Sequence, residues 1–549
     1  MRLPAVTRVA LLLGTAAWIA SVPNAATLKQ FLAAPPAGHE LGAMAFALGG
    51  WLFVLTLTYA ALVLVGVLFP GRSVRVLCAT ALIAAAITGY FSLFLGIQVD
   101  RAMIATVLQT NGAEAFELLH LRLLLWIALV GLVPAVVAWR MPLRPLAWRR
   151  TAGASVGALA VLCVTTLAVV YAQYPRYASA ARNHHIAIET VAPANVVVAS
   201  LHLAASQYAK SKVRAPRGTD AHTAYAIQRP RLLFLVLGET GRASNQGLNG
   251  YLRDTTPRMR AAHGFYFPDT ESCGTVTAVS VPCMFSGFTR HEFSLLRARG
   301  NETLIDVVSR AGARVIWVDN DSGCKDVCAR AELRDVTGSA DPRWCPELGE
   351  CHDEIVLEGL ESQVRAERRD TLVVLHLKGS HGPAYHKRYP ARFERYAPVC
   401  ATSDLSACDL QSLRNAYDNT VLYTDHVVGE TIRLADRITD QFATGVIYVS
   451  DHGESLGESG LYLHGMPYAV APAEQTHVPL YAWVSRRFLD LEQWDTECMT
   501  RQTRLPRTHD NVYATVLGFL DIETVEYKPA LDLFEPCDPP DRTHSAQAR

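Results

Sequence analysis

Acidic residues and a histidine directly follow two of the predicted strands. Glu239 comes after the apolar run 232–237, and Asp451 and His452 come after the run 444–449. The carboxyl ends of parallel strands share one edge of a sheet, so these side chains are expected to meet there. Two carboxylates and an imidazole suit zinc and leave a position for a reacting group. An Asp-His pair after a strand is a weak signal by itself, because loops that bind nothing also contain such pairs.

A nucleophile for this site is expected among the hydroxyl side chains between residues 272 and 286. That stretch contains Thr275, Thr277 and Ser280 between two cysteines. A threonine hydroxyl is a weak nucleophile at neutral pH, but a bound metal lowers its pKa as it does for water. A helix that begins near Thr277 would add backbone N–H groups for a phosphate. The spacing alone does not choose among the three hydroxyls, and all could equally serve in caps and turns.

The polar part of the chain alternates short β-branched runs with helical patterns. The predicted strands are 232–237, 314–318, 371–377, 444–449 and 478–484. The predicted helices include 302–310, 353–365 and 410–438. Continuous apolar strands between helices predict a mainly parallel sheet that is covered on both faces, as in an α/β/α sandwich.

The first part of the chain is apolar, and five of its stretches reach the roughly 20 residues that cross a bilayer core. These stretches are 8–26, 45–69, 73–97, 120–139 and 152–172. Arginines gather before the first stretch, between the second and third, and between the fourth and fifth. By the positive-inside rule, the N-terminus is cytoplasmic and the residues after 172 lie outside. Residues 1–26 also resemble a cleaved secretory signal, whose removal would leave that placement unchanged.

These patterns divide the chain into three parts. A transmembrane domain with five helices covers 1–172, a linker covers 173–231, and a catalytic domain covers 232–549. The linker is rich in basic residues, and its apolar residues in 194–210 have helical spacing. This segment is expected to be either a helix on an anionic membrane surface or a solvated linker.

Ten of the twelve cysteines lie in the polar part of the chain, and eight of them form close sequential couples. This usage predicts disulfides and an oxidising compartment, with structural zinc or free thiols as the alternative. We expect sequential pairing, in which Cys498 joins Cys537. Lysine and arginine number 51 against 51 acidic residues, a balance that argues against a nucleic-acid binder.

Several longer motifs occur in order along the chain. They are Gly238-Glu239-Thr240, Arg242-Ala243, Leu248-Asn249-Gly250-Tyr251, the stretch 272–286, Ser380-His381-Gly382-Pro383-Ala384-Tyr385, Asp451-His452-Gly453-Glu454-Ser455-Leu456-Gly457-Glu458 and Leu463-His464-Gly465-Met466-Pro467-Tyr468. With the five apolar stretches, they resemble the lipid A phosphoethanolamine transferase family. That family includes the mobile colistin-resistance enzymes and belongs to the alkaline-phosphatase-like superfamily. The resemblance extends from the first apolar stretch to about residue 520.

The resemblance implies roles at the reacting centre. Thr277 matches the nucleophile, which becomes phosphoethanolamine-threonine during turnover. The other ligands of the principal zinc are matched by Glu239, Asp451 and His452, and the family leaves open one or two zinc ions. Two further histidines match residues near the phosphoryl group that act as second-metal ligands or proton donors; these are His381 and His464.

The resemblance also implies substrate contacts. Ser322 and Lys325 match a polar cluster that is tied to substrate binding. Thr106, Thr110 and Glu114 match positions that are thought to meet the donor lipid, and their four-residue spacing places them on one face of a helix. Glu114 would pair with the ammonium group of the donor. Thr106 departs from the family, which usually has Asn there. His376 is assigned equally to the site or to packing.

The implied activity is transfer of phosphoethanolamine from phosphatidylethanolamine to a lipid A phosphate, which gives resistance to polymyxins and other cationic peptides. The protein is expected to be a monomer in the inner membrane with a periplasmic catalytic domain. The alternatives are transfer of phosphoglycerol, or of phosphoethanolamine to a core sugar or another glycan. A sulfatase is disfavoured because Cys283-Met284-Phe285 lacks the required Cys/Ser-x-Pro-x-Arg motif. A non-catalytic protein is disfavoured because the nucleophile and all three ligands are present.

Overall fold

The chain forms two compact units. The computed structural model describes residues 5–33, 40–68, 73–97, 112–144, 147–173, 214–223, 230–346 and 351–537, with a few isolated positions between 103 and 196. One unit comprises Met1–Ile104 and Leu119–Ala204, and the other comprises Ala105–Leu118 and Ala205–Arg549. Most of the predicted linker, including the predicted helix 194–210, lies outside the described residues.

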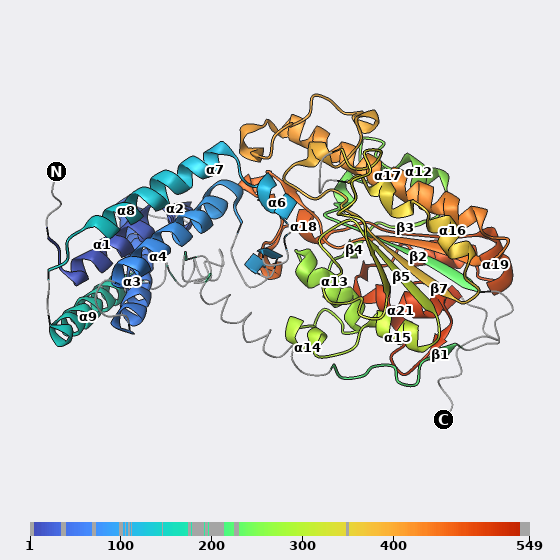
Figure 1. The fold of residues 1–549 in the computed structure, drawn as a ribbon, viewed down its shortest axis with the longest axis horizontal. Helices are drawn as coiled ribbons and strands as arrows, with labels where there is room; N and C mark the ends of the chain where they lie inside the picture. Colours follow the sequence, from blue (N-terminus) through green and yellow to red (C-terminus); the bar gives the residue numbers. More distant parts are fainter. Residues whose placement is uncertain are drawn as a thin grey trace. The chain divides into compact units, whose positions relative to one another are not determined.

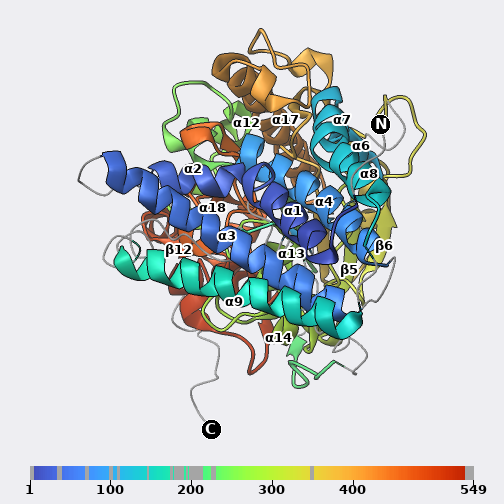
Figure 2. The same cartoon turned by 90° about the vertical axis from the view of Figure 1, so that its left-hand side faces the viewer.

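The first unit is helical (Figure 2). Its helices are α1 (Arg8–Ser21), α2 (Ala25–Ala33), α3 (Glu40–Leu68), α4 (Ser73–Tyr90), α7 (Leu121–Trp126), α8 (Val133–Arg140) and α9 (Trp148–Ala172). Helix α3 packs against α1 and α9, and α4 packs against α8. Within the described residues, four helical segments are long and apolar enough to cross a membrane: Phe46–Gly66, Ser73–Leu95, Leu121–Arg140 and Arg149–Ala172.

These four segments match the second to fifth predicted spans. The first predicted span contains α1, which has 14 residues and is shorter than a bilayer core requires. It ends at Ser21, just before Val22, where the following Pro23 disfavours a continued helix. The structure therefore supports four spans by length, and the count of five stays a prediction.

A seven-stranded mixed sheet forms the centre of the second unit (Figure 1). In spatial order its strands are β3 (Phe265–Phe267), β11 (Leu480–Val484), β8 (Ala443–Ser450), β2 (Arg231–Gly238), β7 (Thr371–His376), β5 (Arg314–Asp319) and β6 (Glu332–Asp335). The run from β8 to β6 is parallel, whereas β11 is antiparallel to both of its neighbours. All five predicted strands are present, so the prediction of a mainly parallel sheet is confirmed.

Helices cover both faces of this sheet (Figure 1). One face packs against α13 (Thr277–Ser286), α15 (Leu304–Arg310) and α21 (Asp510–Phe519), and the other against α12 (Pro257–Ala261), α16 (Leu360–Arg365) and α17 (Leu410–Arg437). Alternate residues of β2 enter the two cores, which is why residues 232–237 are all apolar. The predicted helix 353–365 is instead a 3₁₀ turn, Asp353–Leu357, followed by α16. Gly359 separates the two with a φ of 69°.

Five disulfides stabilise the second unit. They join sequential cysteines as expected: Cys273–Cys283, Cys324–Cys328, Cys345–Cys351, Cys400–Cys408 and Cys498–Cys537. Cys78 and Cys163 are free and lie on apolar helices. The disulfide prediction is therefore confirmed.

Asp418 on α17 fixes the chain that follows β2. Its fully buried carboxylate accepts hydrogen bonds from Asn245 Nδ2 at 2.7 Å, Tyr251 Oη at 2.8 Å and Arg253 Nη1 at 2.6 Å. These bonds anchor the loop that begins with the Gly238-Glu239-Thr240 motif. The Leu248-Asn249-Gly250-Tyr251 motif thus has a structural role, because its tyrosine binds the helix.

We expect Asp418→Ala to destabilise the second unit strongly, because Arg253 would lose its buried partner. Removing one member of a buried ion pair costs about 3–5 kcal/mol, which lowers the thermal midpoint by on the order of 10 °C. Thermal denaturation of the purified protein in detergent measures this. The control is Asp490→Ala, because Asp490 is exposed and pairs at 3.7 Å with an exposed Arg486. Equal midpoints for the two variants would contradict the role of Asp418.

Candidate active site

The carboxyl ends of four neighbouring strands build the site. Gly238 of β2 pairs with Ser450 of β8, so Glu239 and Asp451 leave the sheet side by side. On the other side of β2, His376 ends β7 and pairs with Asp319 at the end of β5. Parallel strands thus gather acidic and imidazole groups at one edge of the sheet.

The backbone turns sharply after Glu239. Thr240 has a φ of 54°, which is unusual for a β-branched residue and marks a position under constraint. The Thr240 N–H donates to Asp451 Oδ1 at 3.1 Å, and the Tyr417 hydroxyl donates to the Thr240 carbonyl at 2.6 Å. These bonds hold the turn and set the direction of the Glu239 side chain.

Thr277 meets the acidic residues and the histidine. Its hydroxyl donates to Glu239 Oε2 at 3.0 Å and lies 3.4 Å from His452 Nε2. The same His452 Nε2 lies 3.2 Å from Asp451 Oδ2 and 3.4 Å from Glu239 Oε1. All four residues are buried. The structure therefore brings together the four side chains that were predicted to act as nucleophile and ligands.

Of the three hydroxyls that the sequence left open, Thr277 is the one that contacts Glu239. Thr275 turns away and donates to the Met466 carbonyl at 2.7 Å. The Ser280 hydroxyl lies one turn further along α13 and is buried. Thr277 is the first residue of α13, so the free N–H groups of the helix start lie beside its hydroxyl. Such N–H groups favour a phosphate, which is the chemistry expected of this nucleophile.

The hydrogen bonds of His452 fix its tautomer. Its Nδ1 lies 2.9 Å from the Gly453 carbonyl, which can only accept, so Nδ1 carries the proton. Nε2 then presents its lone pair toward Glu239, Asp451 and Thr277. Burial lowers the pKa of His452 to about 4, so the imidazole is neutral near pH 7. A neutral histidine with one nitrogen bound to a carbonyl is the usual form of a metal ligand.

The carboxylates of this group fit a cation. Glu239 Oε1 and Asp451 Oδ2 are buried and have no hydrogen-bond partner among the described residues. Burial and the neighbouring charge of Asp451 raise the pKa of Glu239 well above its usual value. A divalent metal at this position would compensate both buried charges. Two oxygens and one imidazole nitrogen, with an open fourth position, fit zinc.

A second group of potential ligands shares Glu239, but a lysine ammonium already lies beside its aspartate. It contains Glu239, Asp321 and His376. The Lys325 ammonium lies 3.7 Å from Asp321 Oδ2, and His376 Nδ1 lies 3.0 Å from Asp319 Oδ2. Burial opposes the charge on His376, but Asp319 and Asp321 outweigh it and raise the pKa of this histidine. The Glu239, Asp451 and His452 group is therefore the better metal site.

Ser322 and Lys325 lie in the loop after β5, beside this second group. The Lys325 ammonium donates to the Ser322 carbonyl at 2.9 Å and also contacts the Ser322 hydroxyl. That hydroxyl donates to Asp321 Oδ2 at 2.8 Å. Lys325 is buried, so its charge acts on the site with little screening. The predicted role of these two residues in substrate binding stays a prediction.

Two histidines extend the site beyond the candidate ligands. The His464 ring centre lies 4.3 Å from that of His452 and 5.9 Å from that of His381. Burial disfavours charge on His464, but Glu454, 3.1 Å from its Nδ1, raises the pKa of this histidine. Burial and the nearby Lys378 lower the pKa of His381. One histidine is thus suited to give a proton and the other to accept one.

Sequence reasoning missed His509. This buried histidine accepts a hydrogen bond from the Cys273 N–H at 3.1 Å and bonds the Ser450 carbonyl through Nε2 at 2.9 Å. It therefore ties the nucleophile loop to the end of β8. Burial lowers the pKa of His509 to about 4, so it is neutral. His509 is far along the sequence from both partners, so no local sequence pattern indicates these contacts.

Glu454 belongs to a motif that the sequence analysis identified, but the sequence did not predict its bond to His464.

The predicted donor-lipid residues are only partly described. Thr110 donates from its N–H and its hydroxyl to the Thr106 carbonyl, at 2.8 and 2.9 Å. Glu114 lies on α6 (Gly112–Glu117), but its side chain is outside the described residues. The prediction that the three residues share one helix face therefore stays a prediction.

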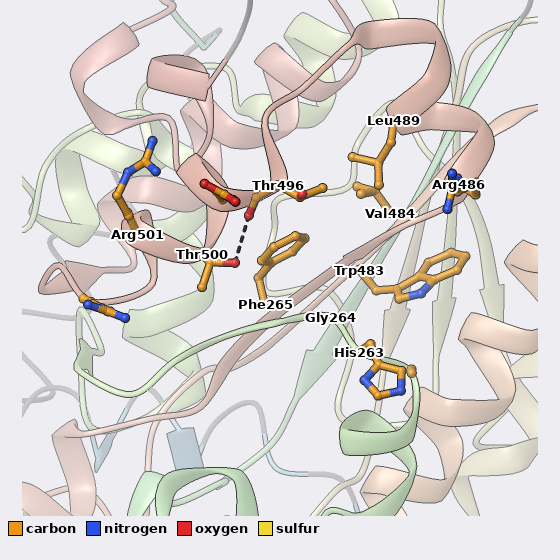
Figure 3. Close-up of a pocket in the computed structure, with 13 residues that line it drawn as sticks. His263, Gly264, Phe265, Trp483, Val484, Arg486, Leu489, Thr496, Thr500 and Arg501 are labelled. Carbon is orange, nitrogen blue, oxygen red and sulfur yellow. Dashed lines mark hydrogen bonds between the residues drawn. The ribbon is translucent and has the colours of Figure 1, made fainter.

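A separate cavity lies at the other end of the sheet (Figure 3). It has a volume of about 570 Å³, and its lining includes Phe265, Trp483, Val484 and Arg501. Val484 pairs with Gly445 near the start of β8, whereas the candidate site lies beyond the end of that strand. None of the predicted site residues lines this cavity.

Comparison with known proteins agrees with both units. Residues 231–522 match the Sulfatase family, and residues 57–208 match the family described as phosphoethanolamine transferase EptA/EptB. Phosphoethanolamine transferase EptA of Salmonella typhimurium is 40% identical over 84% of this chain and 85% of its own. Phosphatidylethanolamine transferase Mcr-1 of Escherichia coli is 35% identical over 81% of this chain and 83% of its own.

A solved structure extends the likeness to the whole chain. The integral membrane protein lipooligosaccharide phosphoethanolamine transferase A (EptA) from Neisseria meningitidis superposes with a TM-score of 0.92 at 32% identity. The match covers 98% of this chain and 100% of that one. That structure is described as an integral membrane protein, which agrees with the four apolar helical segments found here. This chain is a membrane protein that belongs to the phosphoethanolamine transferase family.

Proposed function

We propose that this protein transfers phosphoethanolamine from phosphatidylethanolamine to a phosphate of lipid A. The observation that carries the proposal is the contact of the Thr277 hydroxyl with the buried Glu239, Asp451 and His452 group at the start of a helix. Membership of the phosphoethanolamine transferase family supports phosphoethanolamine as the transferred group. A more distant relative, 27% identical, is named Kdo(2)-lipid A phosphoethanolamine 7''-transferase. That name supports a lipid A-containing acceptor, but its 7'' position is on a sugar, which fits the core-sugar alternative.

In the first step, the Thr277 oxygen attacks the phosphorus of phosphatidylethanolamine. A bond forms between Thr277 Oγ1 and phosphorus, the bond from phosphorus to the glycerol oxygen breaks, and diacylglycerol leaves with a proton. The N–H groups at the start of α13 lie where they would stabilise charge on the phosphoryl oxygens. When bound by Glu239, Asp451 and His452, a zinc ion supplies the positive charge that lets the Thr277 hydroxyl ionise near neutral pH.

In the second step, a phosphate oxygen of lipid A attacks the same phosphorus. The bond to Thr277 breaks, and its oxygen recovers a proton. His464 and His381 are suited to move these protons because they lie next to the group and differ in proton affinity. Lys325 would contribute a buried positive charge for the donor phosphate, and Ser322 would hold its ammonium in place. A role for His381 or His464 as a ligand of a second zinc is the alternative.

Both substrates are lipids, so the proposed enzyme remains at the membrane surface. We infer an inner-membrane location, five spans, a linker over 173–231 and a periplasmic domain over 232–549. The disulfides support the oxidising side of the membrane. The chain is proposed to act as a monomer. Adding ethanolamine to lipid A phosphates introduces positive charge, which would weaken binding of polymyxins and other cationic peptides.

The first prediction concerns the product, modified lipid A. Lipid A from Gram-negative cells that express this chain should gain phosphoethanolamine in mass spectrometry. With Thr277→Ala the gain should fall at least roughly a thousandfold, to below detection, because the nucleophile is lost. Thr275→Ala is the matched control, since its hydroxyl bonds the Met466 carbonyl, and it should retain most of the gain.

Two outcomes would count against this proposal. Equal loss in Thr275→Ala and Thr277→Ala would reject Thr277 as the nucleophile. Unmodified lipid A, together with diacylglycerol release that depends on Thr277, would keep the chemistry and move the acceptor to a core sugar or another envelope glycan.

The second prediction concerns the metal. Zinc should raise the thermal midpoint of the wild-type protein, by the equivalent of about 2.7 kcal/mol at a hundredfold excess over the dissociation constant. Asp451→Asn should abolish that rise. In chelator, the variant should be at least as stable as the wild type, because Glu239 no longer faces a second carboxylate. Metal analysis and thermal denaturation measure both effects. If neither zinc nor chelator changes the thermal midpoint of the wild type, the assignment of a zinc site to Glu239, Asp451 and His452 is contradicted.

A further inference from the structure

Arg388 forms a buried, two-pronged ion pair with Glu117. Its Nη1 donates to Glu117 Oε1 at 3.0 Å, and its Nη2 donates to Oε2 at 2.5 Å. The Arg388 side chain is fully buried and that of Glu117 is 8% exposed. This fork geometry is the strongest form of an arginine–carboxylate pair, and it fixes orientation as well as distance.

The same guanidinium holds the loop that carries His381. Arg388 Nε donates to the His381 carbonyl at 2.7 Å. Arg388 follows directly on the 3₁₀ turn Tyr385–Lys387, so the loop from His381 to Arg388 is closed on itself by this bond. One side chain thus connects Glu117 to the backbone of a residue beside the proposed reaction centre.

Glu117 is the last residue of α6, and α6 belongs to the segment Ala105–Leu118. Although this segment lies between apolar helices in the sequence, its contacts group it with the catalytic unit. It also presents exposed apolar side chains, namely Val107 at 58% and Phe116 at 73%. A short segment with exposed apolar groups and a buried ionic anchor is well suited to hold an acyl-bearing substrate at a fixed place.

We propose that Glu117 and Arg388 are positioning residues that fix α6 against the His381 loop, so that a lipid phosphodiester held beside α6 is presented to Thr277. This inference rests on the proposed function. Neither residue is assigned a role in the chemical step. Their pair would determine where α6 lies relative to the His381 loop, and so affect the lipid donor rather than the chemistry of Thr277.

The test compares a lipid donor with a soluble one. Glu117→Gln removes the charge, keeps the size of the side chain and leaves the bond from Arg388 to the His381 carbonyl in place. We expect KM for phosphatidylethanolamine in mixed micelles, measured by diacylglycerol release, to rise about tenfold or more, as for loss of a charged hydrogen bond. Release of the aryl alcohol from a water-soluble aryl phosphodiester without acyl chains should stay within about twofold, because Thr277 is unaffected.

A matched control and a second variant complete the experiment. Glu492→Gln removes the carboxylate of another partly buried pair, with Arg231 at 2.9 Å at the start of β2, and should leave both reactions unchanged. Arg388→Met removes the ion pair with Glu117 and also the bond to the His381 carbonyl, so both reactions should fall. Thermal midpoints and zinc content of all variants show that they are folded.

The outcomes separate this inference from the proposed function. An unchanged KM for the lipid in Glu117→Gln would overturn the inference. An equal loss of the lipid and soluble reactions in Glu117→Gln would also overturn it, because that result indicates a general structural role. If the wild type releases no diacylglycerol from phosphatidylethanolamine, the proposed function fails and the inference fails with it.

Discussion

The candidate active site depends on two buried carboxylates that face each other at the ends of adjacent strands. Glu239 and Asp451 are placed there by the pairing of β2 with β8, and each has an oxygen without a hydrogen-bond partner among the described residues. Such a pair is unfavourable unless a cation compensates it. The neutral His452 and the hydroxyl of Thr277 complete a ligand set around that position. The other residues of the site either orient these four side chains or lie around the position that they surround.

Several elements from distant parts of the sequence hold the nucleophile in place. The disulfide between Cys273 and Cys283 closes the loop, and His509 ties the loop to the end of β8. These supports matter because a displacement of about 1 Å costs on the order of a hundredfold in rate. In the proposed function the membrane unit would contribute differently, since it would confine the enzyme to the surface that contains its lipid substrates and raise their effective concentration.

Local sequence patterns predicted the features that lie within one continuous stretch of the chain. The apolar strands and the residues at their ends follow from runs such as that of β2 and from the motifs that follow them. The predicted helix 353–365 was wrong because Gly359 breaks it, and the strand β6 was missed because three of its four residues are charged and most are exposed. The roles of His509 and of the Glu117–Arg388 pair could not be predicted. They depend on contacts between residues more than 200 positions apart, which no local periodicity records.

The central claim is that Thr277 becomes covalently attached to the phosphoethanolamine group. The direct test is to mix purified enzyme with phosphatidylethanolamine that carries an isotope in its ethanolamine, without an acceptor, and to quench the reaction early. Peptide mass spectrometry should then find the label on the peptide that contains Thr277, and addition of lipid A before quenching should remove it. Label on another residue, or formation of labelled lipid A with no labelled enzyme at any time, would contradict the account.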